Sequence, residues 1–243
     1  MKKIAYKEMY ENEMSHAWYI ATRKLMIKNI TKYLKKDEKI LDAGCGTGGT
    51  IQFLKKAGFS NIYGVDVNKD AIGYCQKRGI KNICIGNLNN LDFKRNSFDA
   101  VICLDVLYHK NINKSTALNQ FNKVLKKGGI LYLQEPAFDW LKSEHDKVIE
   151  TESRFTDGEI RKLVQNSGFT IIKLSYFNFL LSPIIILKRI LEKLFVKNRK
   201  TSDVYRQNRS VNFIMLQILY LETKIIENFN IPFGISIICI SKK

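Results

Sequence analysis

Residues 40–50, ILDAGCGTGGT, constrain the fold of this chain more than any other stretch. They have the pattern of a buried strand end, a glycine-rich turn and the first turn of a helix whose apolar residues continue at helical spacing. Glycine lets the backbone turn sharply and leaves no side chain between the turn and a ligand. A helix that begins there directs free N–H groups and the positive end of its dipole into the turn. The stretch therefore predicts a site for a ligand that carries a carboxylate or a phosphate.

The glycine spacing alone does not identify that ligand. Gly44, Gly46 and Gly49 match the G-x-G-x-x-G fingerprint of dinucleotide-binding proteins, which is a weak signal by itself. Asp42 stands just inside the strand, where a dinucleotide site usually has a small or apolar residue. Asp66 ends the next apolar run, at about the 20-residue distance expected of an acid that binds ribose hydroxyls. The two acids therefore discriminate between cofactors better than the glycines do.

Strand and helix patterns alternate along most of the chain. This alternation predicts an α/β fold with a doubly wound, mainly parallel sheet and helices on both of its faces. Ligands of such sheets bind beyond the carboxyl ends of the strands, where the winding reverses. The predicted strands are 39–43, 61–66, 82–86, 98–104, 129–135, 169–177 and 231–240, and the helices between them are 49–57, 69–78, 114–125 and 157–167.

The string LDAGCGTG at 41–48 resembles the first motif of class I S-adenosylmethionine (SAM) dependent methyltransferases. Residues 98–109, FDAVICLDVLYH, resemble the strand and apolar turn of family members that act on small molecules, and the segment lacks the Asn/Asp-Pro-Pro-aromatic tetrad of enzymes that methylate DNA bases. From Glu135 onward the chain resembles a bacterial and archaeal subgroup, except that TESRFT at 151–156 replaces the subgroup's His-x-Arg-Arg-Tyr-Thr. The resemblance implies a Rossmann-like sheet of seven strands and SAM as cofactor.

The resemblance also implies where SAM binds. Gly44 and Gly46 would approach its amino-acid part, and Asp66 its ribose hydroxyls. Asn87 stands where the family commonly has an Asp that meets the adenine amino group, and Leu88 would lie against the adenine face. The alternative is that Asn87 is only a polar residue of a turn and does not contact the cofactor. The full set of predicted cofactor-binding residues is Tyr19, Arg23, Asp42, Gly44, Cys45, Gly46, Asp66, Val67, Asn87, Leu88, Leu104 and Asp105.

Two of these predictions concern residues before the first strand. Related methyltransferases often have an aromatic–Tyr–x₃–Arg pattern there, which Tyr19 and Arg23 match, and a purely structural role is the alternative.

His109 is the candidate catalytic residue, because neutral imidazole accepts a proton near pH 7 without special tuning. The alternative is that His109 only packs or hydrogen-bonds in its loop. Asp105 is expected to shape the SAM pocket.

We expect a single domain over residues 1–243. Residues 1–36 would form a helical N-terminal cap, 37–177 together with 231–243 the SAM-binding core, and 178–230 a helical insertion. Within the insertion, residues 187–197 have the pattern of a cationic amphipathic helix, and 211–229 of a second amphipathic helix. The first helix would act as a lid over the active site or lie on an anionic membrane.

Charge and cysteine content limit the classes of binding partner and the cellular compartment that we expect for this chain. The net charge of +17 comes mostly from lysines spread along a chain that is also rich in Ile and Asn, so composition bias explains it better than nucleic-acid binding. An anionic membrane surface is the second explanation. The five cysteines form no C-x-x-C pair, which indicates neither a disulfide framework nor a zinc site and fits a reducing cytoplasm. No apolar segment of signal-peptide type follows the first lysines.

The predicted function is methyl transfer from SAM to a small or lipid-like acceptor. One alternative is a membrane-associated protein that binds SAM without turnover, suggested by the altered segment 151–155. The other is an NAD-type oxidoreductase, suggested by the glycine spacing. The sequence identifies neither the acceptor atom nor the oligomeric state.

Overall fold

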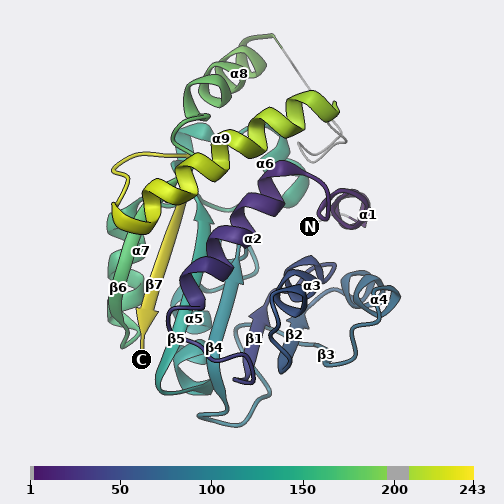
Figure 1. The fold of residues 1–243 in the computed structure, drawn as a ribbon, viewed down its shortest axis with the longest axis vertical. Helices are drawn as coiled ribbons and strands as arrows, with labels where there is room; N and C mark the ends of the chain where they lie inside the picture. The colour runs from purple at the N-terminus through teal and green to yellow at the C-terminus, as the bar shows by residue number, and fades with distance from the viewer. Residues whose placement is uncertain (1–2, 196–207) are drawn as a thin grey trace.

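A seven-stranded sheet forms the centre of the molecule in the strand order β3-β2-β1-β4-β5-β7-β6 (Figure 1). The structure is a computed structural model that describes residues 3–195 and 208–243. All neighbouring strands are parallel except β7, which runs antiparallel to both β5 and β6. The strands are β1 (Ile40–Ala43), β2 (Ile62–Asp66), β3 (Ile83–Ile85), β4 (Phe98–Leu104), β5 (Leu125–Pro136), β6 (Thr170–Phe177) and β7 (Ser236–Lys242). The sheet confirms the predicted α/β class.

The order of the strands reverses between β1 and β4. From β1 the chain first adds β2 and β3 on one side, then crosses back to place β4 and β5 on the other. This switch point lies directly beyond the glycine turn that follows β1, which is where a doubly wound sheet binds its ligand. The sequence pattern therefore predicted both the sheet and the end at which the site lies.

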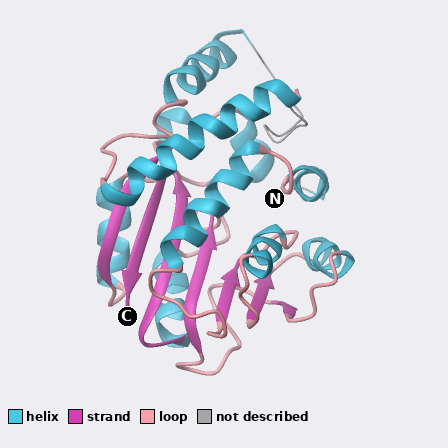
Figure 2. Cartoon of the chain, viewed as in Figure 1, coloured by secondary structure: helices cyan, strands magenta, loops and turns pink. Residues whose placement is uncertain are grey.

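Helices cover both faces of the sheet (Figure 2). In the view of Figure 1, α2 and α9 cross in front of the strands, and α5 and α7 lie behind them. Polar caps begin several helices; α7 starts with a capping box between Thr156 and Glu159. The helices are α1 (Lys3–Asn12), α2 (Ala17–Ile30), α3 (Gly49–Lys56), α4 (Lys69–Lys77), α5 (Lys114–Val124), α6 (Glu144–Ile149), α7 (Asp157–Asn166), α8 (Ser182–Phe195) and α9 (Arg209–Asn228), with a 3-10 turn at Asp139–Leu141.

The helical segments at the two ends of the sequence differ from the predicted pattern. The helical cap predicted over 1–36 contains two helices, because the chain turns between α1 and α2. His16 caps the second helix by accepting a hydrogen bond from the Trp18 N–H at 3.3 Å. Helix α8 begins at Ser182, before the start predicted at 187, and has Pro183 in its first turn. Proline is well tolerated in a first helical turn, because its missing N–H would have no partner there. Residues 196 and 197 of the amphipathic helix predicted over 187–197 lie outside the described residues.

The last strand begins later than predicted. Strand β7 starts at Ser236 and not at Ile231, which makes only an isolated bridge to Tyr176. Pro232 cannot donate a ladder hydrogen bond. Gly234 passes so close to β6 that an added Cβ would lie 2.4 Å from the Phe177 carbonyl oxygen. The chain between 231 and 235 is therefore a tight crossing that precedes the strand.

Candidate functional site

The glycine turn joins β1 to α3 in a conformation that requires glycine. Gly44 and Gly46 have positive φ angles of 83° and 51°. A Cβ added to Gly44 would lie 2.5 Å from a methyl carbon of Val106. The N–H groups of Gly44 and Cys45 both donate to the Val65 carbonyl, at 2.8 and 3.0 Å, and fix the turn to the end of β2. The turn thus presents bare backbone at the switch point, as the sequence predicted.

Asp66 lies beside this turn at the end of β2. One carboxylate oxygen accepts from the Gly46 N–H and the other from the Asn68 N–H, both at 2.9 Å. Burial raises the pKa of the Asp66 carboxyl, and the two backbone hydrogen bonds partly oppose that rise. The backbone therefore orients both oxygens, an arrangement suited to vicinal hydroxyls such as those of a ribose.

Asp42 is a buried carboxyl, and one of its oxygens has no hydrogen-bond partner among the described residues. Burial raises its pKa to about 7; Arg23 lowers the pKa, while Glu13 and Asp66 raise it further. A buried carboxylate oxygen without a partner is costly, and a cationic ligand would remove that cost. The α-ammonium group of SAM is such a cation, so the residues around the turn fit this cofactor.

The predicted cofactor residues Val67, Asn87 and Leu88 lie after the ends of two neighbouring strands, Val67 after β2 and the other two after β3. The side chain of Val67 is 70% exposed and that of Ile85 is 53% exposed, while Leu88 is buried. The side-chain oxygen of Asn87 accepts from the Asn89 N–H at 2.9 Å, which makes it part of a local turn. Two exposed apolar side chains next to the turn fit a flat apolar ring, and the turn contact of Asn87 matches the structural alternative given above.

Arg23 and Tyr19 both lie close to the glycine turn, on α2. The Arg23 guanidinium carbon is 4.9 Å from the centre of the Tyr19 ring. Its nitrogens donate to the Glu13 carbonyl at 2.7 Å, to the Thr50 hydroxyl at 3.2 Å and to the Glu13 carboxylate. Arg23 is thus held mainly by residues of the protein itself.

Glu13 is a residue of this site that sequence reasoning missed. It stands in the break between α1 and α2, is 1% exposed, and its carboxylate accepts from Arg23, from the Thr47 hydroxyl and, at 2.9 Å, from Arg78 after α4. Only a tertiary contact brings these residues together. Glu13 is one of several acids in this stretch, and no local pattern distinguishes it from Glu8 and Glu11.

The end of β4 places Leu104 and Asp105 next to the switch point. Asp105 has a positive φ of 56°, and its carboxylate accepts from the Gln134 side chain at 2.9 Å. Desolvation raises its pKa to about 6. Glu135, a second missed residue, accepts from the N–H groups of Val106 and Leu107 at 3.2 and 2.8 Å and keeps one oxygen without a partner. Both acids stabilise the loop that leads to His109.

His109 is neutral at pH 7. Burial lowers its pKa to about 4, and hydrogen bonds to the backbone of Ile149 and Glu150 oppose that shift. Its ring centre is 4.2 Å from that of Tyr108, and its Nδ1 has no hydrogen-bond partner. The ring is thus able to accept a hydrogen bond at Nδ1, but it is a weaker base than an ordinary histidine.

The segment 139–156 lies beside His109, which forms an isolated β-bridge with Thr151. Arg154, the arginine kept from the subgroup pattern, pairs with the buried Asp146 through two contacts of 2.9 and 3.0 Å. The Glu152 N–H donates to the Tyr108 carbonyl at 2.8 Å, which joins the segment to the loop after β4. Arg154 thus holds the segment together.

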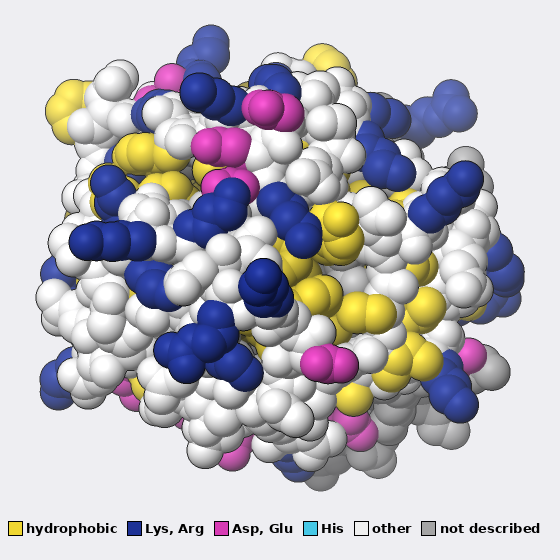
Figure 3. Space-filling view, turned by 90° about the horizontal axis from the view of Figure 1, so that it is seen from below, with side chains coloured by type: hydrophobic (Ala, Val, Ile, Leu, Met, Phe, Trp, Pro, Cys, Tyr) yellow, Lys and Arg dark blue, Asp and Glu magenta, His cyan; other side chains and the backbone are white. Residues whose placement is uncertain are grey.

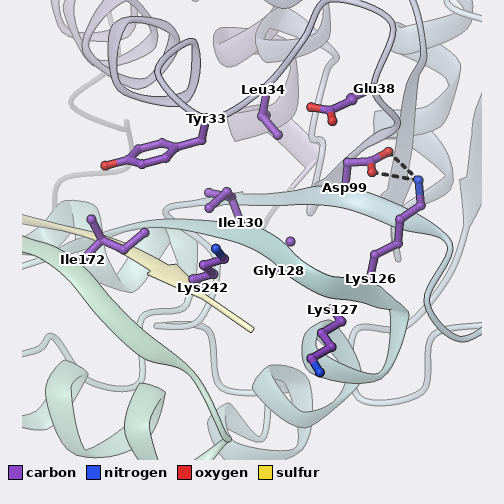
Figure 4. A pocket seen from close by; sticks show the side chains of 11 residues that line it. Tyr33, Leu34, Glu38, Asp99, Lys126, Lys127, Gly128, Ile130, Ile172 and Lys242 are labelled. Carbon is purple, nitrogen blue, oxygen red and sulfur yellow. Dashed lines mark hydrogen bonds and ion pairs between the residues drawn. The ribbon is translucent and has the colours of Figure 1, made fainter.

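A separate hollow of about 320 Å³ lies at the opposite end of the sheet (Figure 4). Lys126 spans its edge and pairs with both oxygens of Asp99, at 2.7 and 2.9 Å. The hollow lies near the start of β4 and therefore contains none of the predicted site residues.

Within residues 3–195 and 208–243, no group of three or more His, Cys, Asp or Glu side chains is placed to hold a metal. In the same part of the chain, no helix is both long and apolar enough to cross a membrane.

Comparisons with known proteins identify the family. A methyltransferase-domain family model matches residues 41–133. An uncharacterized protein of Methanocaldococcus jannaschii is 33% identical over 181 residues, 71% of this chain and 75% of that protein. A sterol 24-C-methyltransferase of Gibberella zeae is 25% identical over 193 residues, 73% of this chain but only 47% of that protein.

The fold comparison agrees. The crystal structure of a SAM-dependent methyltransferase from Archaeoglobus fulgidus has a TM-score of 0.56 at 18% identity and covers 91% of this chain and 94% of its own. These similarities favour methyl transfer over the NAD-type oxidoreductase alternative. The chain belongs to the class I SAM-dependent methyltransferase family, and SAM is its cofactor.

Proposed function

We propose that this enzyme transfers the methyl group of SAM to a small, lipid-like acceptor. Two buried acids around the glycine turn support SAM as the methyl donor. One oxygen of Asp42 has no hydrogen-bond partner among the described residues, and backbone N–H groups orient both oxygens of Asp66. Asp42 would bind the ammonium group of SAM, Asp66 its ribose hydroxyls, and Val67 and Leu88 would contact its adenine.

The protein's part in the reaction is alignment. When bound, SAM supplies an electrophilic methyl group, so the residues need to hold the acceptor in line with it and exclude water. Such positioning lowers a barrier by several kcal/mol, up to about 10. We propose that Tyr19, Asp105 and His109 line the position beyond the turn where an acceptor would approach. Since His109 is a weak base, it would orient the acceptor or receive a proton through Nδ1.

The proposal of a lipid-like acceptor rests on a group of aromatic side chains and on helix α8. The Phe138 ring stacks with the rings of Tyr176, Phe233 and Trp140, at centre-to-centre distances of 5.4, 5.3 and 5.9 Å. Helix α8 reaches the same segment, because Arg189 contacts the Ser143 hydroxyl. We infer that α8 acts as a lid and that the aromatic side chains contact an apolar acceptor. The similarity to a sterol methyltransferase supports this class of acceptor.

Calorimetric titration of SAM and of its demethylated product into the purified protein tests the cofactor site. We expect micromolar binding of both. The acceptor is then sought by incubating the enzyme with methyl-labelled SAM and separate pools of sterols, phospholipids and small amines. Label in an apolar pool would support the proposal, and label only in water-soluble amines would contradict the acceptor class. Binding without transfer to any pool would favour the non-catalytic alternative.

A further inference from the structure

Helices α8 and α9 carry a set of apolar side chains that face solvent. On α8, Ile184 and Leu187 are 67% and 58% exposed, and on α9 Phe213 is 62% exposed. Figure 1 shows α8 and the N-terminal end of α9 beyond the carboxyl ends of the parallel strands, which is the end where we place the SAM site. We call this set the α8–α9 apolar surface: Ile184, Leu187, Ile190, Leu191, Val211, Phe213 and Ile214.

Specific contacts hold these side chains outward. The Asn212 side chain accepts from the Ala17 N–H at 2.8 Å and donates to the Ser15 carbonyl at 2.9 Å, so α9 cannot roll without losing both hydrogen bonds. Its neighbours Val211 and Phe213 therefore remain at the surface. The start of α8 is fixed in the same way, because the buried carboxylate of Glu222 accepts from two N–H groups of the preceding turn, at 2.8 and 3.1 Å.

The charge of the surrounding chain favours one kind of partner. Between 188 and 209 the sequence contains eight Lys or Arg and two acidic residues. Exposed apolar side chains on an amphipathic helix with many cations are typical of segments that lie in the interface of an anionic bilayer. A second copy of this chain would bring the same positive charge and would be repelled by it.

We propose that the α8–α9 apolar surface docks on an anionic lipid bilayer. This proposal deepens the function above, since it places the opening of the site against the phase in which an apolar acceptor is dissolved. Ile184, Leu187 and Phe213 would enter the interfacial layer, and Lys188 on α8, whose side chain is 41% exposed, would contact lipid phosphates. Docking of this kind needs neither turnover nor SAM, so it can be tested independently of the reaction.

The test is co-sedimentation of the full chain with phosphatidylcholine vesicles, with and without phosphatidylserine. We expect binding to the anionic vesicles only. The double variant Leu187→Gln/Phe213→Gln should reduce that binding by at least about tenfold. Lys35→Gln/Lys127→Gln is the matched control, because it removes two lysines from the opposite end of the molecule, a face on which Lys and Arg are also frequent (Figure 3). The control variant should keep its binding within about twofold.

Three results would overturn the proposal. The first is no binding to anionic vesicles, and the second is binding that Leu187→Gln/Phe213→Gln keeps and Lys35→Gln/Lys127→Gln reduces, which would show attraction by net charge alone. The third is a dimer in light scattering that Leu187→Gln/Phe213→Gln dissociates, which would make the surface an interface between copies. SAM titration of each variant separates these outcomes from a failure of the proposed function, because intact SAM binding shows that the site is preserved.

Discussion

The two acids next to the glycine turn differ in what surrounds their oxygens. Asp66 is oriented by two backbone N–H groups, whereas Asp42 is buried with an oxygen that no residue satisfies. The first arrangement fits neutral hydroxyl donors and the second a cation. This difference leads to separate predictions for the two residues.

Asp66→Ala should weaken SAM binding by about 1–3 kcal/mol, the usual cost of leaving buried polar partners unsatisfied. Calorimetry measures this change directly. The matched control is Asp37→Ala, which removes an exposed acid at the other end of the sheet. Unchanged affinity in Asp66→Ala would show that another residue binds the ribose.

Asp42 should make SAM binding depend on pH. Because burial raises its folded-state pKa to about 7, the carboxyl is largely protonated below that pH and ionised above it. The SAM ammonium pairs only with the ionised form, so affinity should rise between about pH 6 and pH 8. In the free enzyme the sign is opposite: the stability gained from keeping Asp42 protonated is full below its unfolded pKa and is lost as pH rises through about 7.

Titrations of SAM across this pH range, repeated with Asp42→Asn, check both expectations. The variant should lose the pH dependence of affinity that is centred near 7, and its thermal stability should fall less as pH rises. Asp105, whose pKa is raised to about 6, remains in the variant and provides an internal reference. An Asp42→Asn profile identical to that of the wild type would contradict the assignment.

His109→Asn should lower the turnover number by less than about 100-fold, the lower end of the range for general-base catalysis. The physical reason is the pKa of about 4, which makes the imidazole a weak base. The measurement is the pH–rate profile with the acceptor that the label experiment identifies. If the wild-type rate falls below a pKa near 4 and the variant lacks this step, His109 receives the proton. A profile without that step in the wild type would indicate an orienting role only.

At the scale of elements, Glu13 connects the N-terminal helices to the glycine turn and to α4. Its carboxylate is shared by Arg23 and Arg78, whose side chains are only 5% and 12% exposed. Removing it would leave two buried cations without their partner. The cap and the turn therefore form one unit in this fold.

Glu13→Ala should accordingly destabilise the protein by about 3–5 kcal/mol, the range for breaking a buried ion pair by removing one partner. Denaturant unfolding measures this loss. Glu11→Ala is a suitable control, because its side chain is 54% exposed and pairs only with Lys7 across one helical turn at 3.9 Å. Equal stability of the two variants would show that the cap is not held through Glu13.

At the scale of the whole molecule, cofactor binding should stabilise the fold. A ligand that binds only the folded state adds about 2.7 kcal/mol at a hundred times its dissociation constant. We therefore expect the melting temperature to rise with SAM and with its demethylated product, and not with NAD. Thermal shift at increasing ligand concentration checks this. A larger shift with NAD would contradict the cofactor assignment.

The sequence alone determined the fold class, the glycine turn and the residues at the strand ends. These features depend on short-range physics: apolar periodicity, the conformations open to glycine, and polar residues that follow buried strands. The predicted strand at 98–104 is matched by β4, whereas the last strand and α8 start at other residues. Pro183 and Pro232 explain both differences, because the effect of a proline depends on which part of an element it occupies.

Only the tertiary structure decided which charges meet. Glu13 and Arg78 are 65 residues apart in the chain, and no local pattern joins them. The partnerless oxygen of Asp42, the pKa of about 4 of His109 and the outward apolar side chains of α8 and α9 likewise follow from what other elements cover. Burial and desolvation are properties of the packed molecule, so the sequence predicted where the candidate site lies and the packing determined the surroundings of its residues.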